Sequence, residues 1–212
     1  MKEKMPLIQL YNIEKSYGKQ KVLMIDELQI SRRDIITITG PNGAGKTTLL
    51  NILAGISLPS KGKRICSKEL NALRLCYIPQ SGGFYRNLSL IENMKIWSNL
   101  YGQSLKHNII DHWFFKVLGL TSIIHKPVGE LSVGFQKIAT ITCALSANPN
   151  GLFLDEPTSG LDQEKTKVFF KWLEEFCLSA VFVIITSHNS LKVSSDCIEI
   201  SLKEGGIQCK EY

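Results

Sequence analysis

Short apolar or alternating runs along the chain predict β-strands. Most are only four to nine residues long, which is usual for strands. We take the last two as edge strands, and we interpret the Lys-Gly-Lys segment at 61–63 as a turn. The predicted strands are residues 7–13, 22–30, 35–39, 64–66, 73–78, 151–156, 181–186, 197–201 and 207–210.

Helical periodicity and cap signals alternate with these strands. Ser89 and Glu92 form a capping box that opens a helix over 90–100. An amphipathic pattern predicts a second helix over 105–118, and Ser132 is placed to cap a third, which would give that helix start an anion-binding character. Further helices are expected over 49–54 and after Asp162. We therefore predict one α/β domain over 1–212, with a small helical subdomain inserted at about 84–146.

Composition fits a globular protein, with 44% hydrophobic and 21% charged residues. No apolar run approaches the roughly 18 residues of a membrane span, and no signal core follows the N-terminus, so we expect a cytoplasmic chain. The six cysteines include no C-x-x-C pair, which favours reduced thiols over a zinc site.

The formal net charge is +6. Such a charge can serve nucleic acid or an anionic membrane surface, but the basic clusters do not interleave with aromatic residues. We therefore expect a solvated face, part of whose charge serves ATP, and no nucleic-acid partner. The clustered cations are Lys15, Lys19, Lys21, Lys61, Lys63 and Arg64.

A glycine-rich loop between the strand at 35–39 and the helix at 49–54 matches the P-loop pattern G-x-x-x-x-G-K-[ST]. Its glycines allow the backbone N–H groups to surround an anion at the start of a helix. We expect Lys46 to reach the β- and γ-phosphates of ATP, Thr47 to bind Mg²⁺ and Thr48 to donate to the α-phosphate. The loop consists of Gly40, Pro41, Asn42, Gly43, Ala44, Gly45, Lys46, Thr47 and Thr48.

Polar residues at other strand ends complete the candidate site. Tyr17 lies in a turn and could stack on adenine, while Gln80 follows a strand that would aim it at the nucleotide. Asp155 and Glu156 end a buried strand, so we assign Asp155 to the Mg²⁺ shell and Glu156 to general-base activation of water. His188, after the next strand, is a candidate γ-phosphate sensor.

The order of these motifs resembles the nucleotide-binding subunit of ABC transporters over nearly the whole chain. The resemblance identifies Tyr17 as the adenine-stacking aromatic and 40–48 as Walker A. It identifies Gln80 as the Q-loop, 131–135 as the signature, 152–156 as Walker B, 159–162 as the D-loop and His188 as the switch histidine. It implies a RecA-like P-loop NTPase core, an N-terminal antiparallel β-subdomain and an inserted α-helical subdomain.

The resemblance also implies a mechanism. Gln80, Lys46, Glu156 and His188 would be catalytic, and Gln80 would join Thr47 and Asp155 at the metal. Two chains would dimerise head to tail, so that Ser132 and Gly134 of one close over ATP on the other. Partner permease subunits would supply the membrane spans, and the chain would lie peripherally on the cytoplasmic face. The stretch 85–93 looks exporter-like, which favours export.

One departure concerns the signature, usually Leu-Ser-Gly-Gly-Gln. Val133 and Phe135 replace its third and fifth residues, whereas Ser132 and Gly134 remain. We expect slower hydrolysis or looser closure. A non-transport ABC ATPase, acting as a nucleotide-switched scaffold or assembly factor, stays open as the alternative function.

Overall fold

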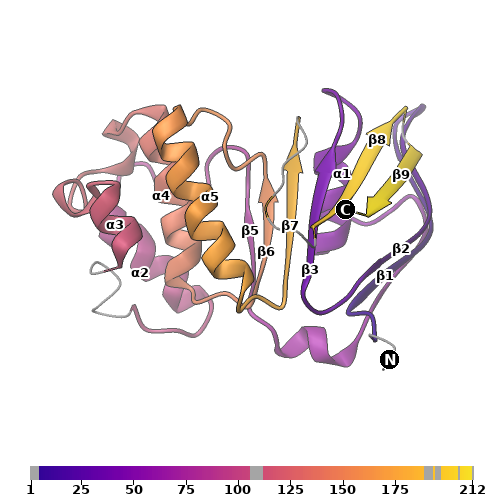
Figure 1. Cartoon of the computed structure of the whole chain (residues 1–212), viewed down its shortest axis with the longest axis horizontal. Helices are drawn as coiled ribbons and strands as arrows, with labels where there is room; N and C mark the ends of the chain where they lie inside the picture. Colours follow the sequence, from indigo (N-terminus) through magenta and orange to yellow (C-terminus); the bar gives the residue numbers. More distant parts are fainter. Residues whose placement is uncertain (1–4, 106–111, 189–192, 194–196, 205, 212) are drawn as a thin grey trace.

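The computed structural model describes residues 5–105, 112–188, 193, 197–204 and 206–211. Two sheets with helices between and beside them build the molecule (Figure 1). A helical region lies at one end and the N-terminal strands lie at the other, as the predicted α/β architecture requires.

The larger sheet has six strands and carries the P-loop. Its first five strands in spatial order run parallel, and the last pairs antiparallel. The carboxyl ends of β3 (Asp34–Thr39), β6 (Gly151–Asp155) and β7 (Phe182–Ser187) therefore meet at one edge, where loops of such sheets bind ligands. The spatial order is β5 (Leu75–Ile78), β6 (Gly151–Asp155), β7 (Phe182–Ser187), β3 (Asp34–Thr39), β8 (Cys197–Lys203) and β9 (Gly206–Glu211).

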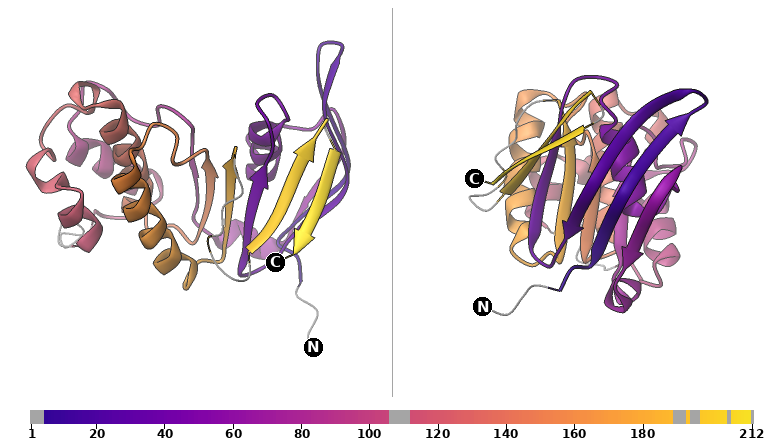
Figure 2. Two further views of the ribbon diagram at one scale, coloured as in Figure 1. Left: turned by 45° about the horizontal axis from the view of Figure 1, so that its top comes forward. Right: turned by 90° about the vertical axis from the view of Figure 1, so that its right-hand side faces the viewer.

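The smaller sheet is antiparallel and N-terminal, in the order β2 (Gln20–Ile30), β1 (Ile8–Tyr17) and β4 (Lys61–Cys66). Helix α1 (Lys46–Ala54) lies between the two sheets, and Figure 2 shows the antiparallel strands crossing in front of it. Apolar residues from both sheets and α1 form one core here, because alternate residues of the parallel strands point to this side.

The other face of the parallel sheet is covered by helices. Residues such as Leu152, Leu154 and Val183 point to this side and pack with buried side chains of the helices. Helices α4 (Val133–Ser146) and α5 (Gln163–Cys177) lie beside the sheet, and α2 (Leu90–Leu100) and α3 (Trp113–Val117) pack against them on the side away from it (Figure 1). Short 3₁₀ turns lie at Lys68–Ala72, Leu120–Ser122 and Val128–Glu130. No helix in the described part of the chain is long and apolar enough to cross a membrane.

Several predicted elements change. The helix expected over 105–118 is present only as α3, while part of that range, 106–111, lies outside the described residues. The predicted turn at 61–63 is wrong, because these residues belong to β4. The strand at 197–201 is not an edge strand, since β8 pairs with β3 on one side and β9 on the other. The α/β class and the N-terminal antiparallel sheet are confirmed, whereas the limits of a subdomain at about 84–146 stay a prediction.

Candidate functional site

The P-loop connects β3 to α1 and depends on its glycines. Gly40 has φ 147° and Gly45 has φ 93°, values that side chains with a Cβ rarely adopt. A Cβ on Gly40 would lie 2.6 Å from the Leu202 carbonyl oxygen, and one on Gly45 would lie 3.0 Å from that of Val22. No described side chain caps the start of α1. The first-turn N–H groups are therefore suited to an anion.

Lys46 points back into this loop. Its Nζ donates to the carbonyl oxygens of Gly40 at 2.9 Å and Pro41 at 3.2 Å. The same ammonium lies 3.5 Å from Oε1 of Glu156 and 3.4 Å from Nδ1 of His188. The side chain is only 5% exposed, so it is a positive charge held inside the loop by its neighbours.

Asp155 lies at the carboxyl end of β6 and accepts several hydrogen bonds. Its Oδ1 accepts from the Thr47 hydroxyl at 3.0 Å and from the Thr186 hydroxyl at 2.7 Å. Its Oδ2 accepts from the Tyr77 hydroxyl at 3.3 Å. Burial and the neighbouring carboxylate of Asp155 raise the pKa of Tyr77, which keeps this phenol a donor. The carboxylate is thereby fixed beside the first turn of α1.

Glu156 follows at once, with a positive φ of 44° that turns its side chain toward the loop. Its Oε1 accepts from Nε2 of His188 at 2.9 Å, and its Oε2 accepts from the amide of Gln80 at 2.9 Å. Its backbone N–H donates to the Thr186 hydroxyl at 2.9 Å. Three of the predicted site residues, Lys46, Gln80 and His188, therefore meet around the carboxylate of a fourth, Glu156.

A cavity of about 390 Å³ opens beside this cluster. It extends from the P-loop to Tyr17, which is 55% exposed and has the Lys15 ammonium 5.2 Å from its ring centroid. Gly40, Pro41, Ala44 and Asp155 do not line the cavity but border the lining residues. The lining consists of Tyr17, Val22, Asn42, Gly43, Gly45, Lys46, Thr47, Thr48, Gln80 and Glu156.

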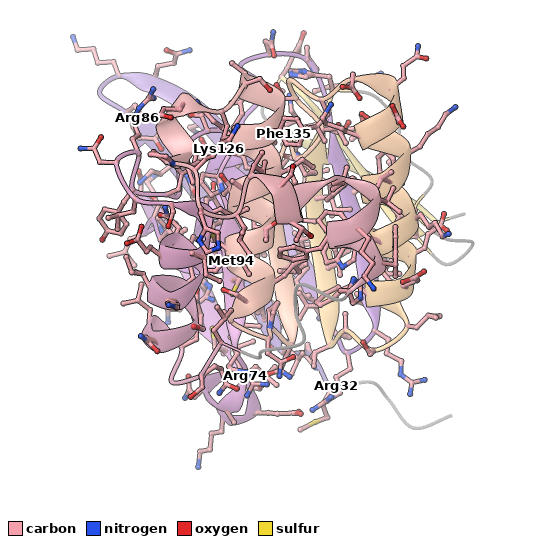
Figure 3. All side chains as sticks on the ribbon, turned by 90° about the vertical axis from the view of Figure 1, so that its left-hand side faces the viewer. Arg32, Arg74, Arg86, Met94, Lys126 and Phe135 are labelled. Carbon is pink, nitrogen blue, oxygen red and sulfur yellow. The ribbon has the colours of Figure 1, made fainter. Side chains whose placement is uncertain are left out.

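The predicted signature residues lie apart from this cavity. The Ser132 hydroxyl caps α4 by accepting from the Phe135 N–H at 3.4 Å, and neither Ser132 nor Gly134 is among the lining residues. Val133 is 72% exposed. Phe135 has the Lys165 ammonium 5.0 Å from its ring centroid. Figure 3 places Phe135 at the end opposite Arg32 and Arg74, which precede β3 and β5, so the signature is on the side where the parallel strands end.

A family model described as ABC transporter matches residues 17–159. The chain belongs to the ABC transporter family. ATP hydrolysis is the general activity of this family.

Two relatives illustrate the similarity of this ABC chain to curated proteins. The lantibiotic transport ATP-binding protein SrtF of Streptococcus pyogenes is 30% identical over 86% of this chain and 80% of its own length. The zinc import ATP-binding protein ZnuC of Wigglesworthia glossinidia brevipalpis is 32% identical over 96% of this chain and 85% of its own.

Solved structures show the same fold. The dimeric structure of MJ0796, a bacterial ABC transporter cassette, has a TM-score of 0.78 at 22% identity, and the match covers 97% of this chain and 98% of that one. A dimeric post-hydrolysis state of that cassette, bound to ADP and Pi, also matches. At this identity the match shows the fold of the chain.

Sequence reasoning missed three residues of the ABC site. Thr186 bridges Asp155 and Glu156, Tyr77 holds Asp155, and the buried Lys137 contacts the ends of β5 and β6. Burial lowers the pKa of Lys137 to about 8, against the opposing effect of the two carboxylates. The only sequence signal for Thr186 is its place in the strand, because its contact with Asp155 depends on the register of β6 with β7.

Proposed function

We propose that this chain is the ATP-binding and hydrolysing subunit of an ABC transporter, and that it powers export of a substrate through partner membrane subunits. The observation that carries the proposal is the position of the Glu156 carboxylate. It lies 3.5 Å from the P-loop lysine Lys46, is hydrogen-bonded to Gln80 and His188, and lines the P-loop cavity. A carboxylate so placed can take a proton from water beside a bound phosphate.

The other residues around the cavity bind the nucleotide and assist hydrolysis in this proposal. The P-loop N–H groups and Lys46 bind the phosphates, and the exposed ring of Tyr17 stacks on the base. Glu156 accepts the proton of the attacking water, while Gln80 and His188 orient the carboxylate and the γ-phosphate. All nine loop residues, Gly40, Pro41, Asn42, Gly43, Ala44, Gly45, Lys46, Thr47 and Thr48, form the phosphate cradle in this proposal.

The residues at the start of α1 also fit Mg²⁺. The Thr47 hydroxyl and the Asp155 carboxylate bring two oxygens within 3.0 Å of each other, and hard cations prefer oxygen ligands. We assign Thr47, Asp155 and the amide oxygen of Gln80 to this ion. When bound, Mg²⁺ neutralises phosphate charge.

The site as one chain presents it lacks the signature residues. Ser132 and Gly134 do not line the cavity, yet they begin a helix whose N-terminal end suits an anion. We therefore propose a head-to-tail dimer, homo- or heteromeric, in which Ser132 and Gly134 of one chain close over ATP held by the other. Exposed Val133 would face the nucleotide in such a dimer, and slower hydrolysis or looser closure is the expected consequence.

Membrane-spanning permease subunits complete the proposed assembly, with this chain on the cytoplasmic face. Export rests on the stretch 85–93 alone, and the similar ZnuC carries an import name, so transport assays in vesicles of both orientations would decide the direction. The scaffold alternative receives no support from the relatives, which are named as transport proteins. Purification from detergent tests it, because a transport subunit brings a membrane protein with it.

Substitution Glu156→Gln tests the central assignment. It keeps the size and shape of the side chain but removes the base, so we expect steady-state ATPase activity to fall by about 100-fold or more, the range of general-base contributions. Glu164→Gln, in the first turn of α5, is the matched control and should leave the rate unchanged. Equal rates for wild type and Glu156→Gln would reject the proposed base.

A further inference from the structure

Lys137 is a buried cation that the proposed chemistry does not use. It lies in α4, five residues beyond the Ser132 cap, and is 5% exposed. Its Nζ donates to the carbonyl oxygens of Pro79 at 2.9 Å, Gln80 at 3.0 Å and Asp155 at 3.4 Å. A lysine ammonium has three donors, so these three acceptors satisfy it fully.

The three acceptors belong to two different strands. Pro79 and Gln80 directly follow β5, whereas Asp155 ends β6, and these strands are parallel neighbours. One ammonium therefore joins the signature helix to both strand ends that carry polar groups of the site. Burying a charge is costly unless it is fully hydrogen-bonded. The three carbonyl oxygens meet this requirement for a cation at this position.

A second contact from the same helix shows the difference. The Thr140 hydroxyl donates to the Gly82 carbonyl oxygen at 2.6 Å, and thus reaches the loop after β5 but not β6. Lys137 reaches both. Among the described residues its ammonium donates only to backbone oxygens, so it fixes where the peptide units of Gln80 and Asp155 lie while leaving their side chains to other partners.

We propose that Lys137 is a positioning residue that couples the signature helix to the Gln80 loop and to the Asp155–Glu156 end of β6 in the same chain. The inference rests on the proposed function. When a second chain's nucleotide meets Ser132 at the start of α4, a shift of that helix moves Lys137, which lies about 7.5 Å along the helix from the cap at 1.5 Å per residue. The ammonium then moves the backbone that carries Gln80 and Glu156.

The expected kinetic consequence follows from the position of Lys137 outside the cavity lining. Nucleotide contacts remain when the ammonium is removed, so KM for ATP should stay within about twofold of wild type. The hydrolytic groups lose their alignment, so kcat should fall by about 10- to 100-fold, the size of effect that a displacement near 1 Å can produce.

The test compares wild type with Lys137→Met, which keeps an unbranched apolar stem and removes the ammonium, and with Lys137→Gln, which keeps a shorter neutral donor. The matched control is Thr142→Val in the same helix, whose buried hydroxyl has no hydrogen-bond partner among the described residues. Melting curves establish that each variant folds. Hydrogen exchange of the nucleotide-free chains is measured over 79–84 and 153–158, and ATPase kinetics are measured beside it.

We expect faster hydrogen exchange in both segments for Lys137→Met and Lys137→Gln, but not for Thr142→Val. We also expect kcat to fall in the two Lys137 variants while KM stays constant. Unchanged exchange in either segment would overturn the coupling, whether or not the chain hydrolyses ATP. Faster exchange with unchanged kcat would overturn the catalytic part. Absence of ATPase in the wild type would instead reject the proposed function, and the exchange result would still decide the coupling.

Discussion

The Thr186 hydroxyl contacts both residues of the acid pair, Asp155 and Glu156, at the end of β6. Its removal gives a prediction that can be measured. It donates to Oδ1 of Asp155 at 2.7 Å and accepts from the N–H of Glu156 at 2.9 Å, with no exposed surface. Thr186→Val keeps the shape of the side chain and removes both bonds. The Glu156 N–H is then buried without an acceptor, and Asp155 loses one of its donors.

The magnitude follows from these two losses. A buried N–H left unpaired costs about 1–3 kcal/mol, and a hydrogen bond to a charged group contributes about 1.5–3 kcal/mol. Asp155 keeps its bonds from Thr47 and Tyr77, so we expect the low part of the sum, about 3 kcal/mol of unfolding free energy. For a chain of this length, each kcal/mol shifts Tm by about 2–4 °C, which gives a loss of roughly 6–12 °C.

Thermal denaturation followed by circular dichroism measures this shift. Thr186→Ser keeps the hydroxyl and should retain most of the stability. Thr142→Val removes a buried hydroxyl that has no partner among the described residues, and should change Tm little. If Thr186→Val melted within about 1 °C of wild type, where roughly 6–12 °C is expected, the bridging role of Thr186 would be refuted.

Two further predictions concern nucleotide binding and acid stability. Tyr17→Ala should weaken ATP binding by roughly 5- to 150-fold in fluorescence titrations, since base stacking contributes about 1–3 kcal/mol. Tyr17→Phe should bind ATP as the wild type does. Equal affinity for the Ala and Phe variants would count against stacking. Hydrogen bonds from the side chain and backbone of Ser89 hold the pKa of Glu92 below its ordinary value of 4.5. The ionised Glu92 therefore stabilises the fold above pH 4.5, and this stabilisation is lost as the pH falls through the lowered pKa. Wild type should therefore exceed Glu92→Gln in urea midpoint at pH 7 and lose that advantage in acid; a constant difference across pH would contradict the linkage.

The P-loop and the acid pair could be predicted because their sequence signals are local. Glycine spacing before a lysine, and a strand that ends in Asp155 and Glu156, each predict a site from adjacent residues, and the structure brings the two segments together. Contacts that depend on strand register left no such signal. Thr186 pairs with Asp155 only because β6 and β7 align in parallel at that position. The residues near Thr186 in the sequence do not indicate this pairing.

The error at Gly62 has a physical reason. Glycine between two lysines is typical of a turn, but here Gly62 lies in β4 with φ 87°, and a Cβ on it would approach the carbonyl oxygens of Asn12 and Tyr11 at 2.2 and 2.4 Å. The pairing of β1 with β4 shifts register at the same place. A glycine that permits close backbone approach at a bulge cannot be distinguished by sequence alone from one that reverses the chain.

Lys46 already has ligands inside its own chain, namely two loop carbonyl oxygens and the Glu156 carboxylate. A polyphosphate that enters the cavity therefore has to replace the contacts that Lys46 already makes inside the chain. The affinity for the polyphosphate therefore includes the cost of breaking the contacts that Lys46 makes inside the chain, so a substitution that weakens those contacts can tighten binding without adding a contact to the nucleotide.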